Sequence, residues 1–309
     1  MTKLRRYFRR MRQNWQVYVF LLIPLAYLII FQYVPMAGIQ IAFKKFNPVK
    51  GIWGSPWVGF THFEKFFKSY YFERVVTNTL RISIYSLIAN FPIPILFALL
   101  LNSIPGTKFK KTVQTVTYMP HFISTVVLVG MMNQMLSPTT GLYGMIYRVL
   151  GGEGFPEDIL AKANSFTHLY VWSGIWQNFG WSSIIYMAAL AGVSPSLHEA
   201  AQIDGANRLQ RVIHVDFPCL LPTATIMLIL RFGQIMNVGY EKVYLMQNTM
   251  NQRMSEVIST YVYKIGLGAQ GRSDYSLATA VGLFNSVINL VLITVFNQVT
   301  KKLSDTSLW

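Results

Sequence analysis

The chain has 309 residues, of which 52% are hydrophobic and 13% charged, and its formal net charge is +15 at pH 7. This composition is typical of a membrane protein and excludes an ordinary soluble domain. The long apolar runs also argue against nucleic acid as the partner of the basic residues. A single cysteine, Cys219, excludes an internal disulfide.

Six apolar stretches are long enough to cross about 30 Å of hydrocarbon as helices. They are residues 17–39, 77–101, 117–136, 168–190, 220–238 and 277–299. These stretches predict an all-α membrane protein with six transmembrane helices, in which residues 17–309 form a single transmembrane domain. The segment 1–16 is strongly basic and has no cleavage pattern of a signal peptide. Since Lys and Arg favour the cytoplasmic side, we expect this segment and both termini to be cytoplasmic.

The expected outer loops are long for a membrane protein. The first, residues 44–76, is rich in Trp, Tyr and Phe, which favour the membrane interface, and predicts a short helix at residues 60–67. We expect this helix to lie on the outer membrane surface, and the alternative is a loop packed on the protein itself. The other two loops, residues 137–167 and 239–276, are expected to contact an outer partner.

A polar island at residues 199–222 separates the fourth and fifth spans. It predicts a short amphipathic helix at residues 197–201, a turn at Asp204 and Gly205, and a second helix from Ala206. Ser196 and Glu199 have the spacing of a capping box. Pro218 and Pro222 mark the place where a membrane helix begins or bends. This helix–turn–helix is either an ordinary cytoplasmic loop or a surface that docks into the groove of a soluble partner.

The same island resembles the EAA loop of ABC importer permeases. The matching positions share the gapped spacing of that motif: Glu199, Ala200, Ala201, Asp204, Gly205, Ala206, Pro218 and Pro222. Val212 and Val215 depart from the family, which often has Phe and Ile there. The resemblance implies that residues 194–218 form a cytoplasmic coupling loop, which docks on an ATPase subunit and transmits its closure to the membrane helices.

Three further segments, at residues 33–46, 90–102 and 114–124, resemble permeases of the maltose-transporter type. More narrowly, they resemble the subgroup that takes up oligosaccharides from complex polysaccharides. The resemblance implies a type I ABC importer fold in a bacterial cell membrane and a second, homologous permease subunit. It also implies two ATPase subunits, which would bind ATP and Mg, and an extracellular solute-binding protein that delivers the oligosaccharide.

Polar residues within the last two spans are candidates for the translocation path. Arg231, Gln234 and Asn237 follow one another at helical spacing in the fifth span, and Asn285 and Asn289 do so in the sixth. Because a charge in lipid is costly, Arg231 is expected to face protein or water. Two roles remain open for the set: lining a sugar pathway, or bonding helices together. If Arg231 meets the substrate, an acidic sugar such as a uronic-acid oligomer is favoured.

Enzymatic function is not expected. His198-Glu199-Ala200-Ala201-Gln202 resembles the zinc motif H-E-x-x-H, but Gln202 replaces the second histidine, and the remaining histidines have no metal-binding spacing. The chain also lacks the P-loop motif, so no catalytic residue, metal or cofactor is assigned to it.

The sequence therefore predicts the permease subunit of an ATP-driven oligosaccharide importer. The alternative is a secondary transporter of a small polar solute driven by an ion gradient. That alternative would call for acidic groups within the spans and an inverted repeat, and the sequence displays neither.

Overall fold

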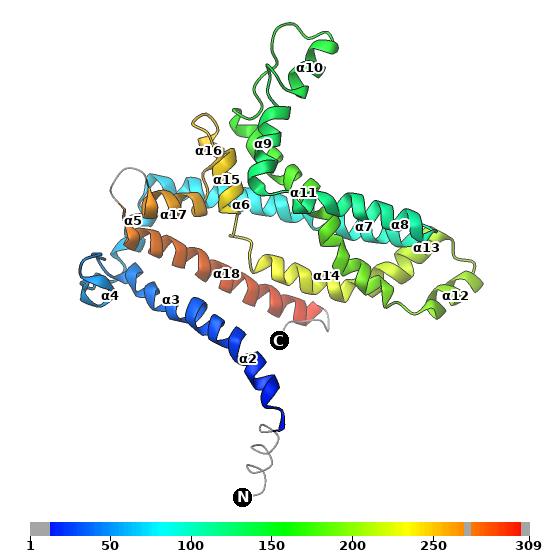
Figure 1. Ribbon diagram of the computed structural model, residues 1–309, viewed down its shortest axis with the longest axis horizontal. Coiled ribbons are helices and arrows are strands. Elements are labelled where there is room, and N and C mark those ends of the chain that lie inside the picture. Colours follow the sequence, from blue (N-terminus) through cyan, green and yellow to red (C-terminus); the bar gives the residue numbers. More distant parts are fainter. Residues whose placement is uncertain (1–12, 269–272, 304–309) are drawn as a thin grey trace, which may run out of the picture. The chain divides into compact units, whose positions relative to one another are not determined.

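The computed structural model describes residues 13–268 and 273–303, which fold into helices joined by loops (Figure 1). Most of the basic segment predicted to anchor the N-terminus, up to Arg12, lies outside these residues. Within the described ranges the pairing of extended chain is limited to an isolated bridge between Lys44 and Trp57. The prediction of an all-α protein is therefore confirmed.

The chain divides into two compact units, and helix α18 (Tyr275–Leu303) contributes to both. The first unit comprises residues 1–67 and 265–283, and the second comprises residues 68–264 and 284–309. The helical segments of the first unit before α18 are α2 (Trp15–Leu28), η1 (Ile29–Tyr33), α3 (Val34–Met36), η2 (Ala37–Phe43), α4 (Gly51–Gly54) and α5 (Thr61–Phe67).

In the first unit, a run of helical turns from Trp15 to Phe43 forms an apolar span, and none of its most apolar stretch is buried within the chain. Lys44 follows it and is buried, with its ammonium bonded to the Ile52 carbonyl oxygen and 5.7 Å from the centre of the Trp53 ring. The aromatic loop then forms α5, so the short helix predicted at residues 60–67 is confirmed.

The second unit carries the remaining helices. They are α6 (Tyr70–Asn90), α7 (Pro92–Ser103), α8 (Thr107–Tyr118), η3 (Met119–Phe122), α9 (Thr125–Met135), α10 (Leu142–Val149), α11 (Ala163–Ala191), α12 (Pro195–Ile203), α13 (Arg208–Arg211), η4 (Val212–Asp216), α14 (Phe217–Phe232), α15 (Tyr240–Met246), α16 (Gln252–Ser255) and α17 (Ile258–Leu267), whose last turn belongs to the first unit.

Four helical runs in the described residues are long and apolar enough to cross a membrane. They are Trp15–Phe43, Tyr70–Ser103, Arg208–Phe232 and Tyr275–Lys302. A bent pair, Thr107–Phe122 with Thr125–Met135, raises the number to five. Helix α11 covers the fourth predicted span but is too polar to pass on composition alone. A count of six spans therefore remains a prediction.

The third predicted span, residues 117–136, is not one straight helix. Its two halves meet at a bend of 96°. Pro120 lies in the 3₁₀ turn before the bend, and the Ser124 side chain accepts a hydrogen bond from the Val127 N–H at the start of α9. A capped new helix with its own direction therefore replaces the continuous span.

Two apolar clusters hold the second unit together. The first includes Ile82, Phe166 and Val243, and the second includes Ala98, Tyr186 and Leu220. Helix α11 contributes to both clusters and packs along α6 and α7. Figure 1 shows α12 and α13 at one end of this packing, and α15 and α16 toward the other.

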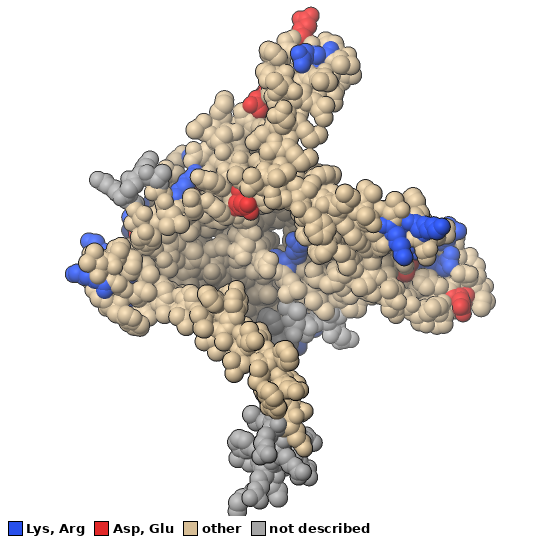
Figure 2. Space-filling model, viewed as in Figure 1, with Lys and Arg blue, Asp and Glu red and all other residues tan. Residues whose placement is uncertain are grey.

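Basic side chains gather at one end of the second unit. Figure 2 shows them over the end where α8 and α13 lie. These two helices carry Lys108, Lys110, Lys111, Arg208 and Arg211. The concentration of positive charge beside α12 is typical of the cytoplasmic side of a membrane protein.

Candidate functional site

The polar island forms the helix–turn–helix that the sequence predicts. Helix α12 runs from Pro195 to Ile203, and the chain then turns at Gly205, whose φ is +79°. A side chain is strained in this left-handed region, so the turn favours glycine. The second helix starts later than predicted, at Arg208, because Asn207 caps it.

The capping box predicted at Ser196 and Glu199 is wrong. Ser194 is the N-cap of α12 and bonds the Ser196 hydroxyl over 2.8 Å instead of a backbone N–H. The capping box of this loop lies at its second helix, where Asn207 and Gln210 each accept a hydrogen bond from the other's backbone N–H. Local hydrogen bonds therefore define the turn between the two short helices.

The predicted coupling residues form one surface on this loop. Glu199, Ala200, Asp204 and Gly205 are exposed, and Ala201 and Ala206 are half-buried. A shallow cavity of about 320 Å³ is lined by Ala201, Asp204, Gly205, Ala206, Gln210, Arg211, His214 and Val215. Two apolar side chains stand out beside it, since Ile203 is 86% and Leu209 67% exposed. Exposed apolar side chains beside a cavity are typical of a docking surface.

Pro218 lies where α14 begins, in agreement with the prediction, although α14 continues a longer helical run. A continuous helical run extends from Arg208 to Phe232, with the π-helical turn η4 at Val212–Asp216 immediately before α14. Pro218 lies in the first turn of α14, and Pro222 lies inside the helix. The widened turn accommodates Pro218, which has no N–H for the bond of a regular helix.

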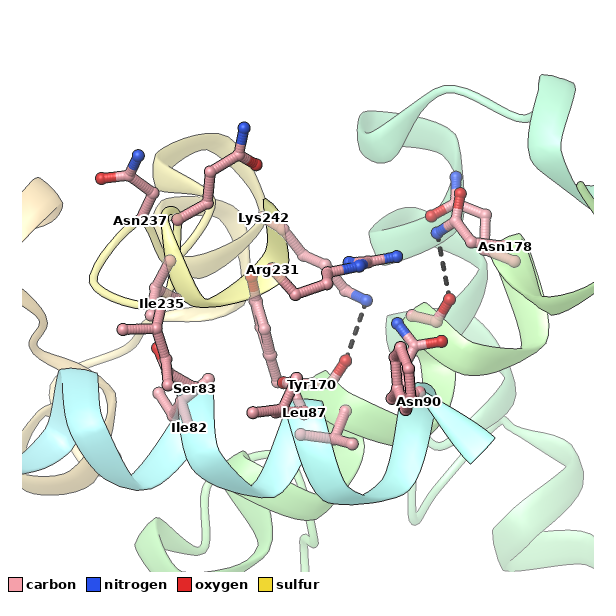
Figure 3. Close-up of a pocket in the computed structure, with 17 residues that line it drawn as sticks. Ile82, Ser83, Leu87, Asn90, Tyr170, Asn178, Arg231, Ile235, Asn237 and Lys242 are labelled. Carbon is pink, nitrogen blue, oxygen red and sulfur yellow. Dashed lines mark hydrogen bonds between the residues drawn. The ribbon is translucent and has the colours of Figure 1, made fainter. Parts of the chain in front are cut away.

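The second unit contains a cavity of about 270 Å³, which is lined by residues of α6, α11, α14 and α15 (Figure 3). Arg231 enters it from the last turn of α14, and Lys242 enters it from α15. Asn90, at the end of α6, points into the same space in Figure 3, and its Oδ1 is buried with no hydrogen-bond partner in the described chain. The cavity therefore joins two cations to an unsatisfied acceptor.

Neither cation has a carboxylate partner among the described residues. Lys242 donates a hydrogen bond of 3.0 Å to the backbone oxygen of Tyr170, and its ammonium is 4.9 Å from the centre of the Tyr170 ring. Burial lowers the pKa of Lys242 to about 8, because the charged form loses its hydration. Such a pair of cations favours an anionic ligand.

Gln234 and Asn237 line the same cavity as Arg231, but not through the helical spacing that the sequence predicts. Helix α14 ends at Phe232, and residues 233–236 form turns. Ile293 of α18 lies so close to Gly233 that a Cβ there would be 2.7 Å from its Cδ1. A glycine therefore permits α18 to approach at the point where the helix stops.

Asn285 and Asn289 of α18 bond to the end of this turn. Both donate to the Asn237 side-chain oxygen, over 2.9 Å and 3.0 Å, and the Asn289 side chain accepts from the Met236 N–H. Neither lines the cavity of Arg231. These contacts fit the interhelical role for the two α18 residues, whereas a pathway role for Arg231, Gln234 and Asn237 remains a prediction.

His198, the first residue of the incomplete zinc motif, has a different partner. Its Nε2 lies 3.3 Å from a carboxylate oxygen of Asp216. In the described part of the chain, no group of three His, Cys, Asp or Glu residues is placed to hold a metal ion.

Sequence reasoning missed Lys242 and Asn90. Lys242 falls in what the sequence predicts to be an outer loop, and Asn90 is one amide in an apolar span. Only the fold brings them to Arg231. The available signal was a lysine eleven residues after an intramembrane arginine, with no acidic residue nearby except Glu241.

Comparison with known proteins places this architecture. Residues 90–305 match the family described as binding-protein-dependent transport system inner membrane component. The chain belongs to this family. Its members are non-enzymatic components of transporters, so the expectation that the chain is a permease is confirmed.

Two relatives from Bacillus subtilis (strain 168) match nearly the whole chain. Protein LplB is 39% identical over 298 residues, which cover 96% of this chain and 92% of the relative. The polygalacturonan/rhamnogalacturonan transport system permease protein YteP is 39% identical over 307 residues, which cover 99% of this chain and 94% of the relative.

Two solved structures are also similar. A bacterial ABC transporter involved in the import of the acidic polysaccharide alginate contains a chain that is 37% identical, with a TM-score of 0.86, covering 97% of this chain and 99% of that one. The second is the bacterial alginate transporter in complex with an alginate pentasaccharide-bound periplasmic protein. Its matching chain has a TM-score of 0.87, and the match covers 98% of this chain and 100% of that one.

Proposed function

We propose that this chain is the permease subunit of an ATP-driven importer of acidic oligosaccharides in a bacterial cell membrane. The observation that carries the acidic substrate is the cavity in which Arg231 and Lys242 lie without a carboxylate partner in the described chain. A uronic-acid oligomer supplies carboxylates to the cations and hydroxyl donors to Asn90 Oδ1. The similarity to permeases for polygalacturonan and alginate supports this chemistry.

In this proposal Arg231, Gln234, Asn237 and Lys242 line the path of the sugar. Arginine binds a carboxylate through two parallel hydrogen bonds, which favours it for planar acidic groups. Lysine contributes a point charge that adapts to sugars in several positions. A path that moves its ligand onward requires weak contacts at several sites, and two cations with neutral amides between them meet that need.

In this proposal the loop at residues 194–218 transmits the ATP-driven closure of the ATPase subunits to this chain. Glu199, Ala200, Ala201, Asp204, Gly205 and Ala206 dock on an ATPase subunit, with Ile203 and Leu209 as apolar contacts. The ATPase pair binds ATP and Mg, and its closure moves α12. The importer comprises this chain, a second homologous permease, two ATPase subunits and an extracellular solute-binding protein. The solved complex with a periplasmic protein supports that last partner.

The distribution of basic residues supports a particular orientation of the chain in the membrane. Basic residues gather at the end of the second unit that carries α8 and α13, beside the proposed docking loop. The positive-inside rule assigns this end to the cytoplasm, where an ATPase has access to the loop. With six spans, both termini lie on the same side.

Uptake by the reconstituted importer tests the proposal. Arg231→Gln and Lys242→Met should each lower the uptake of uronic-acid oligosaccharides at least tenfold and leave neutral oligosaccharides of equal length less affected, since a charged hydrogen bond contributes roughly 1.5–3 kcal/mol. Lys162→Met, at an exposed pair with Glu157, is the matched control. Equal losses for acidic and neutral sugars would contradict the acidic substrate.

The same vesicles separate this importer from a transporter driven by an ion gradient. ATP inside the vesicles should support uptake after an ionophore has removed every gradient. Affinity purification of the chain should also recover a P-loop ATPase and a second permease. Uptake that stops with the ionophore would favour the secondary transporter.

A further inference from the structure

Asp216 is a buried carboxylate at the start of α14, with 3% of the residue exposed. It ends the π-helical turn η4, and α14 begins at the next residue. Its Oδ1 lies 3.3 Å from His198 Nε2 and accepts a hydrogen bond of 3.3 Å from Asn102 Nδ2. These partners compensate for the cost of a charge held away from water.

Several elements meet at this carboxylate. His198 belongs to α12, and Asn102 is the next-to-last residue of α7. Lys110 of α8 donates a hydrogen bond of 3.0 Å to the backbone oxygen of Asn102. Arg211 of α13 adds a positive charge that acts on Asp216. Asp216 therefore connects the polar loop to the ends of two membrane helices.

His198 is the polar link between α12 and these helices. In the described residues, the other polar contacts of α12 are a bond between Ser194 and Ser196 and the backbone bonds of its own turns. Helix α12 also presents exposed side chains on most of its surface. A force applied to α12 therefore reaches the transmembrane helices through few contacts, and the polar one is His198–Asp216.

Helix α14 continues from this point to the cavity. It runs without interruption from Phe217 to Phe232 and carries Arg231 in its last turn. Arg231 follows Asp216 by fifteen positions in one helical run, which corresponds to about 22 Å along the axis. A shift or rotation at Asp216 is therefore carried along one rod to the cavity.

We propose that the His198–Asp216 pair transmits the movement of α12 to α14, with Asn102 holding the carboxylate in place. His198 and Asp216 are positioning residues and contact neither substrate nor nucleotide. The inference rests on the proposed function, in which an ATPase moves α12. It assigns to this chain a contact that links the docking loop to the cavity.

The number of sugars moved per ATP hydrolysed tests this role, because a merely structural residue would leave that ratio unchanged. The full importer is reconstituted with its binding protein, and uptake and ATP hydrolysis are measured together. His198→Ala and Asp216→Asn should each lower the ratio about tenfold while hydrolysis continues. His198→Gln retains a donor and should recover part of the ratio. His168→Ala, at a histidine bonded to Tyr85, is the matched control.

A double variant shows whether the two residues act together. His198→Ala with Asp216→Asn should be no worse than either single variant, because one contact cannot be lost twice. The exchange His198→Asp with Asp216→His should restore part of the ratio. Additive losses, or an unchanged ratio in both single variants, would overturn the inference. Loss of bound ATPase in His198→Ala would also overturn it, since His198 would then belong to the docking surface.

Glu199→Lys distinguishes this inference from the proposed function. If Glu199→Lys abolishes uptake while the His198 and Asp216 variants keep a normal ratio, the docking loop stands and only the transmission contact is wrong. If Glu199→Lys, Gly205→Val and the His198 and Asp216 variants all transport normally, the proposed coupling role fails as well.

Discussion

Lys242 Nζ lies 3.0 Å from the backbone oxygen of Tyr170 and 4.9 Å from the centre of the ring of the same residue. This arrangement holds the ammonium at the wall of the cavity while leaving it without a counter-ion in the described chain. Gly174 leaves room for the ammonium, because a Cβ at that position would lie 3.3 Å from Lys242 Nζ. The ammonium therefore contacts Tyr170 and lies close to the backbone at Gly174.

The titration of Lys242 predicts a pH dependence. With a pKa of about 8, Lys242 is charged below pH 8 and neutral above it, whereas uronic-acid carboxylates are ionised throughout this range. The initial rate of acidic-sugar uptake at low sugar concentration should therefore fall as the pH on the side open to the cavity rises through about 8. Lys242→Arg, which stays charged, should remove this decline.

Unfolding is not the expected cause of that decline. The pKa of Lys242 is lower in the folded chain than its usual value of 10.5, so the unfolded chain binds more protons between about pH 8 and 10.5. This residue's contribution therefore makes the folded state more stable as pH rises. A fall in thermal stability that parallels the fall in uptake would contradict the assignment to Lys242.

Substitution of Gly174 should displace the ammonium. Gly174→Val places branched carbons against Lys242 Nζ, so uptake of acidic oligosaccharides should fall several-fold, with a smaller effect from Gly174→Ala. Gly130→Val is the control, because a Cβ at Gly130 meets nothing within 4 Å. Initial uptake rates of the three variants, normalised to protein in the membrane, provide the measurement.

Gly205 should be required for its backbone conformation. A Cβ there meets nothing within 4 Å, but φ is +79°. A β-branched residue is strained in this region by roughly 1–3 kcal/mol, and asparagine is tolerated better. Gly205→Val should abolish uptake and reduce the amount of co-purified ATPase, whereas Gly205→Asn should preserve more of both. Equal activity of the two variants would exclude a backbone cause.

Gly180 should matter for stability. A Cβ at Gly180 of α11 would overlap the backbone oxygen of Thr117 on α8. Gly180→Ala should therefore force these two helices apart and cost about 1–3 kcal/mol of folding free energy. Gly130→Ala adds the same methyl group in open space and should be neutral or stabilising. Thermal unfolding of the purified complex in detergent distinguishes the two.

The helix–turn–helix at residues 194–218 can be predicted from the sequence, whereas the cavity around Arg231 cannot. The spacing from Glu199 to Pro222 lies within one continuous segment, so its helix–turn–helix is a local consequence of capping and glycine chemistry. The cavity instead combines α6, α11, α14 and α15, whose meeting depends on tertiary packing. Arg231 was identified because a charge in an apolar span is conspicuous, whereas Lys242 is ordinary until the fold encloses it.

Two predictions were wrong for similar reasons: the straight third span and the shared helical face of Arg231, Gln234 and Asn237. The 96° bend at Ser124 is invisible to hydropathy, since both arms are apolar and only the cap marks the new helix. The helical spacing of Arg231, Gln234 and Asn237 suggested one face, but the helix stops at Phe232, where Ile293 of α18 packs against Gly233. Periodicity predicts a face only for as long as the helix continues.

Asp216 is the residue immediately before α14, and Arg231 is the next-to-last residue of that helix. In evolution, substitutions at the two ends of this helix should therefore be coupled. A harmful substitution in the cytoplasmic loop should be suppressed by second-site substitutions near the cavity. Likewise, a substitution that admits a new sugar should alter the number of sugars transported per ATP hydrolysed. Genetic selection for growth on a different sugar would therefore be expected to return mutations at both ends of this one helix.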